Sequence, residues 1–334
     1  MRAFSRHYGI AALVLISAVP ACNDSSSGAS GSDADAGRGG AGKKSEAVQD
    51  AGGGGGSGGM LDAGGSSDMT ADAAVPTDAS QPDDTLVEIH FRALAGGQDV
   101  TCTGMYAGLG SSASTLNVAD LRLFVHDLRL IDDSGAETPI ALEADDSFQS
   151  DSVALLDFED GTGNCQDNGT RDMHEVIRGH VEPGNYTGLA FTVGLPDADN
   201  HADPTLAKAP LDVMSMHWSW NDGYRFLRLD AFTDAGDFNV HLGSTQCTAS
   251  DSGDVTCNQA NRPEVRLSQF DPEQDEVVLD LAALLADSDL SLAPGCIAGA
   301  TDDVCAPVMQ HLGIDPGTGE ADPTQQDAFR AEPR

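Results

Sequence analysis

Two tryptophans, Trp218 and Trp220, are the only ones in this chain, and a single residue separates them. They lie in the segment MSMHWSWNDGY, which also contains His217. His201 precedes this segment and His241 follows it. Cross-strand aromatic packing is one explanation for such a pair. Placing both indoles among imidazoles and methionines, however, predicts a chemical site as well as a packed hairpin.

His201 and His241 are the best candidates for metal ligands, and His217 is an additional candidate. Neutral imidazole binds copper, zinc and nickel, and copper(II) has the highest affinity in the divalent series. His201 lies in the loop-forming stretch PDADNHADP, where a ligand can be presented freely. Each histidine taken singly is also explained as a hydrogen-bonded loop or surface residue. Five further histidines are expected to be structural or exposed: His90, His126, His174, His180 and His311.

Strand periodicity predicts how the tryptophan segment is positioned. Asp222-Gly223 is typical of a two-residue hairpin turn, which would join a strand at about 213–220 to one at about 224–232. Alternation along the first strand would place four oxidisable side chains on one face: Met214, Met216, Trp218 and Trp220. Downstream, Phe238, Val240 and Leu242 would share a face, so that His241 points the other way.

Short strands separated by turn residues predict an all-β fold, an antiparallel β-sandwich with disulfide-clamped loops and few short helices. Strand-like runs cover residues 86–93, 121–130, 186–193, 264–267 and 276–281. The turns between them contain Asp-Ser-Gly, Pro-Gly-Asn, Asn-Asp-Gly and Asp-Ala-Gly. Two short helices are expected, near residues 171–179 and at residues 281–286.

The N-terminus resembles an export signal. Arg2 and Arg6 precede a short apolar run that is too short to span a membrane as a helix. Val19-Pro20-Ala21-Cys22 resembles a bacterial lipobox, so residues 1–21 are expected to be a lipoprotein signal peptide and Cys22 the lipidated first residue of the mature chain. Ordinary secretion with Cys22 left over is the alternative. In either case the mature chain leaves the cytoplasm.

Composition divides the rest of the chain. Residues 22–84 are rich in Gly, Ser, Ala and Asp and contain no aromatic residue, so they are expected to form a disordered tether. Residues 85–315 are expected to form one domain, followed by a disordered tail at 316–334. The formal net charge of −37 makes nucleic acid an implausible partner, and a soluble exported surface explains it as well as cation binding does.

Six cysteines remain after Cys22, and an even number in an exported protein predicts three disulfides. Six cysteines allow 15 connectivities. We favour two local loop clamps with one pair left over: Cys247–Cys257, Cys296–Cys305 and Cys102–Cys165. No nucleophile–base constellation is evident, so the protein is not expected to be an enzyme. Acidic clusters such as Asp197-Ala198-Asp199 lack the full spacing of a calcium loop.

Several blocks of the sequence resemble the MbnP-like family of exported copper-binding proteins, the four-cysteine metallo-mystery-pair proteins. Its W-x-W…G-Y-[KR]-F and H-L-G-S-T-x-C elements correspond here to residues 218–226 and 241–247. Further similar blocks are DLRLFV at 120–125, VALLDFED at 153–160 and YTGLAFTVGLP at 186–196. The four cysteines of the pattern correspond to Cys102, Cys165, Cys247 and Cys257. His217 occupies a position where the pattern has an aromatic residue, and Cys296 and Cys305 fall outside it.

The resemblance implies a copper site made by histidine and by a kynurenine derived from Trp. It implies that a dihaem cytochrome c peroxidase-like (MauG-like) partner carries out the oxidation, with His201, His241 and Trp218 as the site; Trp220 is the other candidate for conversion. We therefore expect a copper-binding lipoprotein, anchored at the outer membrane on its periplasmic face or at the cell surface. The rival interpretation is a metal-free surface module for adhesion or scaffolding.

Overall fold

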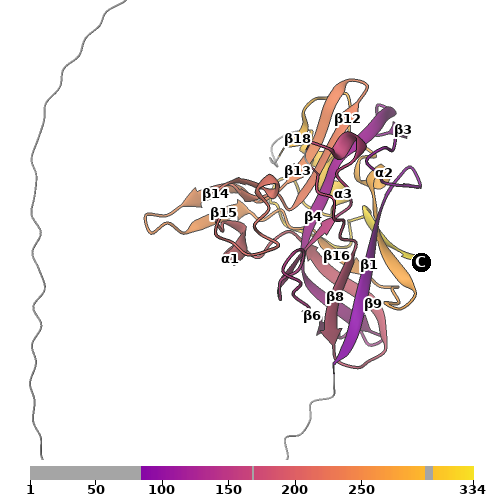
Figure 1. Ribbon diagram of the computed structural model, residues 1–334, viewed down its shortest axis with the longest axis vertical. Coiled ribbons are helices and arrows are strands. Elements are labelled where there is room, and N and C mark those ends of the chain that lie inside the picture. The colour runs from indigo at the N-terminus through magenta and orange to yellow at the C-terminus, as the bar shows by residue number, and fades with distance from the viewer. Residues whose placement is uncertain (1–83, 168, 298–303) are drawn as a thin grey trace, which may run out of the picture. The chain divides into compact units, whose positions relative to one another are not determined.

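The computed structural model describes residues 84–334, apart from residue 168 and residues 298–303 (Figure 1). The predicted signal peptide, Cys22 and the predicted tether lie outside the described residues. Within the described part, no helix is long and apolar enough to cross a membrane.

The larger of the two main sheets has nine strands and is built around the long central strand β4 (Ser114–Asp132). Its main path runs β16-β9-β4-β12-β13-β18, and β3, β5 and β7 also pair with β4. The bounds of its other strands are β3 Tyr106–Leu109, β5 Glu137–Pro139, β7 Val153–Asp157, β9 Tyr186–Val193, β12 Leu227–Thr233, β13 Gly236–Leu242, β16 Glu264–Leu267 and β18 Gly295–Ile297.

The second sheet has six strands and runs β19-β17-β1-β8-β6, with β2 paired to β1. Its bounds are β1 Thr85–Ala95, β2 Gln98–Asp99, β6 Ala141–Leu142, β8 Val176–Val181, β17 Asp275–Asp280 and β19 Phe329–Pro333. Two separate hairpins complete the strands: β10 (His217–Ser219) with β11 (Gly223–Tyr224), and β14 (Thr245–Ala249) with β15 (Val255–Gln259). Figure 1 shows hairpin β14–β15 extending away from the sheets.

This architecture confirms the predicted β-sandwich. Most strand pairs are antiparallel, but β1–β17 and β13–β18 are parallel. All five predicted strand runs lie within observed strands, except that Leu281 begins a helix. The described helices are short: α1 (Asp197–Asn200), α2 (Leu281–Leu284), α3 (Cys305–His311) and the 3₁₀ turns η1 (Gly163–Cys165) and η2 (Met214–Met216).

Alternation along β4 creates two different faces of the larger sheet. Leu121, Leu123 and Val125 belong to the main core between the sheets, and all three are fully buried. Asp120, Arg122 and Phe124 point to the opposite face, which we call the outer face, where Phe124 belongs to a second, smaller core. The outer face is thus both buried and charged, unlike a solvated sheet face.

One helix prediction is confirmed and one is wrong. Helix α2 forms within residues 281–286, and the Asp280 side chain accepts hydrogen bonds from the first-turn backbone N–H groups of Ala282 and Ala283. The predicted helix near residues 171–179 does not form. Strand β8 begins at Val176 instead and pairs with β1, far away in the sequence. Pairing with a distant strand outweighs local helix preference there.

The three favoured disulfides are confirmed: Cys102–Cys165, Cys247–Cys257 and Cys296–Cys305. The second links directly opposed residues of hairpin β14–β15, and the third links β18 to the start of α3. Both act as local clamps, whereas the first joins segments 63 residues apart.

The predicted disordered tail at 316–334 is wrong, because its last residues form β19 at the edge of the second sheet. Phe329 begins this strand with 3% of its surface exposed, and its ring packs edge-on against Phe191 at 5.6 Å. Ionic contacts add to the pairing, since Arg330 lies 2.6 Å from Asp280. The polar composition of residues 316–328 gives no sign of the strand that follows them, and this strand completes the core.

Replacing Phe329 by Ala should lower the free energy of unfolding by about 3–5 kcal/mol, because it leaves a cavity in the main core. Phe232→Ala is the matched control, since Phe232 is 46% exposed, and it should change stability by less than about 0.5 kcal/mol. Urea unfolding of the full chain measures both. Equal, small losses would show that the C-terminal strand contributes nothing to the core.

Candidate metal centre

The tryptophan segment forms a hairpin, but a shorter one than predicted. β10 and β11 pair His217 with Tyr224 and Ser219 with Gly223. The turn between them is closed by Ser219, whose hydroxyl donates to Asp222 at 2.7 Å. The prediction of a strand beginning at residue 213 is wrong, because Met214–Met216 is the 3₁₀ turn η2. The predicted face shared by Met214, Met216 and the two tryptophans is therefore also wrong.

Residues 195–226, which we call the cover segment, pack on the outer face of the larger sheet. Met216, Tyr224 and Phe226 are fully buried there with Phe124, and Met214 is 59% exposed. The Tyr224 hydroxyl donates to the carbonyl of Leu211 at 2.6 Å. Burial raises the pKa of Tyr224 to about 12, so its hydroxyl stays protonated and keeps this bond. The smaller core therefore places the hairpin over the charged part of the sheet.

His241 lies on that outer face, as its alternation with Phe238, Val240 and Leu242 predicted. It is 9% exposed, and its Nε2 forms a short hydrogen bond with the carboxylate of Asp230 on the neighbouring strand. An ionised carboxylate only accepts hydrogen bonds, so the ring proton of neutral His241 belongs on Nε2. Nδ1 then carries the lone pair. A carboxylate behind an imidazole is the usual support of a histidine that binds a metal.

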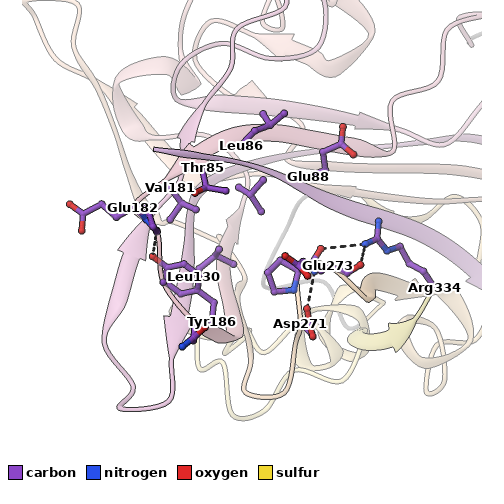
Figure 2. A pocket seen from close by; sticks show the side chains of 15 residues that line it. Thr85, Leu86, Glu88, Leu130, Val181, Glu182, Tyr186, Asp271, Glu273 and Arg334 are labelled. Atoms are coloured by element: carbon purple, nitrogen blue, oxygen red, sulfur yellow. Dashed lines mark hydrogen bonds between the residues drawn. The ribbon is translucent and has the colours of Figure 1, made fainter. Parts of the chain in front are cut away.

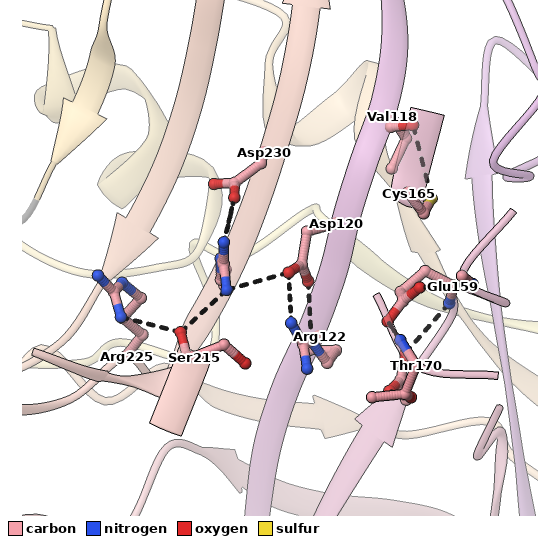
Figure 3. A network of polar contacts seen from close by, with 12 residues as sticks. Val118, Asp120, Arg122, Glu159, Cys165, Thr170, Ser215, Arg225 and Asp230 are labelled. Carbon is pink, nitrogen blue, oxygen red and sulfur yellow. Dashed lines mark hydrogen bonds and ion pairs between the residues drawn. The ribbon is translucent and has the colours of Figure 1, made fainter. Parts of the chain in front are cut away.

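Asp230 is held ionised. Burial on its own would raise the pKa of this carboxyl group, but hydrogen bonds from His241 and Arg228 outweigh burial and lower the pKa to about 2. Arg228 also contacts Asp120 at 3.1 Å, and Asp120 accepts a hydrogen bond from Arg122 at 2.8 Å. Figure 3 shows this chain of contacts from Asp230 through Asp120 to Arg122.

Trp218 lies between this network and the hairpin β14–β15. Its ring centroid is 6.4 Å from that of His241, and the guanidinium of Arg225 lies over the indole at 5.0 Å. Gly243 permits this position, because a Cβ there would lie 2.6 Å from Cζ3 of Trp218 and 2.7 Å from the carbonyl oxygen of Tyr224. A groove of about 500 Å³ opens beside Trp218 and is also lined by Asp222, Ser244, Thr245, Gln246, Cys247 and Ile297.

His201 follows α1 and contacts the other tryptophan through the backbone. Its Nδ1 is 2.9 Å from the carbonyl oxygen of Trp220, which can only accept, so Nδ1 carries the proton. Nε2 then carries the lone pair, 3.2 Å from the amide nitrogen of Asn200 and 3.4 Å from Sγ of Cys257. Asn200 is itself buried and accepts from the backbone N–H of Tyr224 at 3.1 Å.

The structure therefore brings the predicted residues together in two pairs. Trp218 contacts His241, and His201 contacts the backbone of Trp220, whose side chain is 47% exposed. In the described part of the chain, no hydrogen bond or ring contact joins His201 to His241 directly; the hairpin β10–β11 connects the two pairs.

His217, the additional candidate, packs edge-on against Tyr224 with ring centroids 4.8 Å apart. Burial lowers its pKa, and its buried Nε2 has no hydrogen-bond partner among the described residues. The neutral ring thus offers a lone pair or a donor that the fold leaves unused.

Other histidines are mostly accounted for by structure. Nδ1 of His126 bonds with the carbonyl of Gly194 at 2.9 Å, and Nδ1 of His174 bonds with that of Leu155 at 2.7 Å. His311 lies between two carboxylates, Asp287 and Asp327. These contacts agree with the structural roles predicted for the three residues.

Two clusters in the described residues bring three potential metal-binding side chains within 4.8 Å of one another: His201 with Cys247 and Cys257, and Glu159 with Cys102 and Cys165. The cysteines of each cluster are joined in a disulfide, so they offer no thiolate. A different groove of about 600 Å³ lies at the ends of β1, β8 and β9 beside Arg334 (Figure 2), and its lining contains neither histidine nor cysteine.

Sequence reasoning missed the charged residues that support the site: Asp120, Arg122, Arg225, Arg228 and Asp230. The signal was present, because Asp-Leu-Arg-Leu at 120–123 and Leu-Arg-Leu-Asp at 227–230 alternate charge with apolar side chains. In register, Arg228 is opposite Arg122 on one side and His241 on the other. Such alternation normally marks a solvated face, and only the cover segment makes it a buried one.

A β-sandwich with supported imidazoles beside a tryptophan defines a candidate metal-binding protein. The sequence model of the MbnP family matches residues 84–298, and the chain belongs to this family. The fold is similar to the solved structure of MbnP from Methylosinus trichosporium, with a TM-score of 0.67 and 31% identity, covering 75% of this chain and 98% of that one. No curated protein matches the chain significantly. The resemblance inferred from the sequence blocks is thereby confirmed.

Gly243→Ala should displace Trp218, because the added Cβ meets both the indole and an immobile backbone oxygen. We expect a shift in tryptophan emission and a loss of stability of about 1–3 kcal/mol. Gly317→Ala is the control, since its nearest contact is a side-chain oxygen at 3.2 Å. In a Trp218→Phe background the emission shift should vanish. An unchanged spectrum of Gly243→Ala would contradict the close approach.

Proposed function

We propose that this protein binds copper through His201 and His241, together with a third nitrogen donor made by oxidation of Trp218. The observation that carries the proposal is the pairing of Asp230 with Nε2 of His241, beside the Trp218 ring. Both histidines have the support expected of ligands: one ring nitrogen is occupied by a carboxylate or a carbonyl, and the other carries a lone pair. Family membership supports a metal-binding role.

Copper suits this set of donors better than harder metals do. Imidazole favours copper, zinc and nickel over calcium and magnesium, and copper has the highest affinity in the divalent series. Carboxylates near His241 are already engaged, since Asp230 is bonded to Arg228 and His241. The neutral nitrogen donors therefore remain as the ligands, and such a set also accommodates reduced copper.

Trp218 is the tryptophan that the surroundings favour for conversion. An indole nitrogen keeps its lone pair in the ring and cannot bind a metal, whereas opening the pyrrole ring to kynurenine yields an aniline-type amine. Trp218 lies next to His241 and borders an open groove, so an oxidant can reach it and its product is near a ligand. Trp220 contributes its backbone carbonyl to His201 and exposes its ring.

Conversion of an indole to kynurenine is an oxidation, so it requires an oxidant. We propose a dihaem cytochrome c peroxidase-like (MauG-like) protein that uses peroxide, with the present chain as substrate and not as enzyme. Export and a lipid anchor on Cys22 at the outer membrane would place this chain outside the cytoplasm, where an exported partner can reach it. The exposed Trp220 ring offers an aromatic surface for electron transfer to the partner.

Copper content tests the ligand assignment. His201→Ala and His241→Ala should each lower copper affinity at least ~10-fold, because each removes a ligand. Elemental analysis of purified protein after copper loading and dialysis measures the loss. His311→Ala, whose ring lies between Asp287 and Asp327, is the matched control and should retain copper.

Asp230→Asn refines this test, because it keeps His241 but removes the charge that fixes its ring proton. Copper affinity should fall about 10–100-fold. Equal copper content in the wild type and both histidine variants would overturn the ligand assignment, and no bound copper in any of the three would favour a metal-free surface module.

Intact mass tests the oxidation. In protein co-produced with the dihaem partner, conversion of Trp to kynurenine should add about 4 Da, because two oxygen atoms are added across the indole double bond and hydrolysis by water then releases formic acid. Trp218→Phe should abolish the increase, and Trp220→Phe should keep some of it. An unmodified mass with an active partner would contradict the mechanism.

A further inference from the structure

His201 contacts a disulfide through the ring nitrogen that carries its lone pair. Nε2 lies 3.4 Å from Sγ of Cys257, and the donor atoms of His201, Cys247 and Cys257 all lie within 4.8 Å of one another. The proton of the ring is fixed on Nδ1 by the carbonyl of Trp220 at 2.9 Å. The lone pair is therefore on Nε2, which faces Sγ of Cys257 and accepts a hydrogen bond from the amide nitrogen of Asn200 at 3.2 Å.

The hairpin that carries this disulfide has other supports. Cys247 and Cys257 are directly opposite in the β14–β15 ladder, with Thr248 paired to Thr256 beside them. At the hairpin base, Ser244 donates to the carbonyl of Ala260 at 3.0 Å. Further bonds there join Thr245 to Gln259 at 2.7 Å, Asn261 to Gly243 at 2.9 Å and Gln259 to Gly317 at 2.9 Å. The two sulfur atoms would thus stay opposed after reduction.

Accessibility distinguishes this disulfide from the others. Cys247 and Cys257 are partly exposed. The four cysteines of the other two disulfides are at most 3% exposed: Cys102, Cys165, Cys296 and Cys305. Thiol–disulfide exchange requires direct attack on a sulfur atom, so a reductant reaches the hairpin disulfide first.

From these observations we propose that His201, Cys247 and Cys257 form a redox-gated binding site for a soft metal ion, Cu(I). A dithiol reduces the Cys247–Cys257 bond: the dithiol becomes a disulfide, and each cysteine gains one hydrogen. Cu(I) then displaces the thiol protons and is bound by two thiolates and Nε2 of His201. Thiolate ligands select Cu(I) over harder ions, and metal binding releases the protons.

This site goes beyond the proposed function and does not depend on it. The two sites share only His201, which would change partners from the tryptophan-derived site to the thiolates when the disulfide opens. His241 and Trp218 belong to the first site alone. Variants of these residues therefore separate the two proposals.

The first measurement is selective reduction of the full-length protein. Limiting dithiothreitol followed by iodoacetamide should label Cys247 and Cys257, and peptide mass mapping should find the other disulfides intact. Labelling spread evenly over all six cysteines would overturn the gate.

The second measurement is Cu(I) binding, with bicinchoninate as the competing chelator, before and after reduction and anaerobic removal of dithiothreitol. Reduction should create a Cu(I) site at the thiolates that the oxidised protein lacks, and His201→Ala should weaken that site at least ~10-fold. His241→Ala is the matched control and should retain the gain. Alkylated wild-type protein should lose it without any mutation, which guards against a variant that misfolds.

If disulfide-intact His241→Ala loses copper and reduction produces no Cu(I) binding, the proposed function stands and the redox-gated site is contradicted. If His201→Ala leaves the Cu(I) binding of the reduced protein unchanged, the proposed site is also contradicted, because the thiolates would then bind Cu(I) without the imidazole. A gain in the reduced protein alone, with no copper bound by disulfide-intact protein whose tryptophan has been converted, would support the gated site and contradict the proposed function.

Discussion

The ionised carboxylate of Asp230 is the interaction on which the rest of the candidate site depends. It accepts hydrogen bonds from Arg228 and from Nε2 of His241, and these bonds hold its pKa at about 2. The cost of burying these charges is offset only by good geometry, so such a network is weak evidence of stability. Its clearer consequence is positional: it fixes the ring proton and the orientation of His241.

The same network also holds the backbone of the tryptophan segment in place. Arg228 and Arg225 both donate to the carbonyl of Ser215 at 2.9 Å, and Arg225 also donates to that of His217 at 3.0 Å. The Arg225 guanidinium lies over the Trp218 ring, where burial and the nearby charge of Arg228 lower the pKa of Arg225 to about 10. It remains a cation at neutral pH. One set of charges thus orients both an imidazole and an indole, although they come from different parts of the chain.

Features that depend on local patterns could be predicted from the sequence. Alternation placed His241 on the face opposite Phe238, and short cysteine spacings indicated the two local disulfides. Features that depend on distant partners could not. β8 pairs with β1 and β19 pairs with β17, and neither strand has a strong local signal. The turn at Met214–Met216 likewise follows from packing, because Met216 is buried in the smaller core while Arg225 donates to its carbonyl.

The two histidines differ in a way that suits different roles. His241 is bonded to a carboxylate inside a buried ionic network, so moving it would remove one of the hydrogen bonds that hold Asp230 ionised. The contacts of His201 are with neutral groups, namely a carbonyl, an amide and Sγ of Cys257, on a partly exposed loop. Those bonds are weaker than charge-assisted ones and are easily replaced by water. The fold therefore holds the side chain of His241 in one position and leaves that of His201 able to exchange partners. That difference suits the two proposals, in which His201 takes part in both sites and His241 in one.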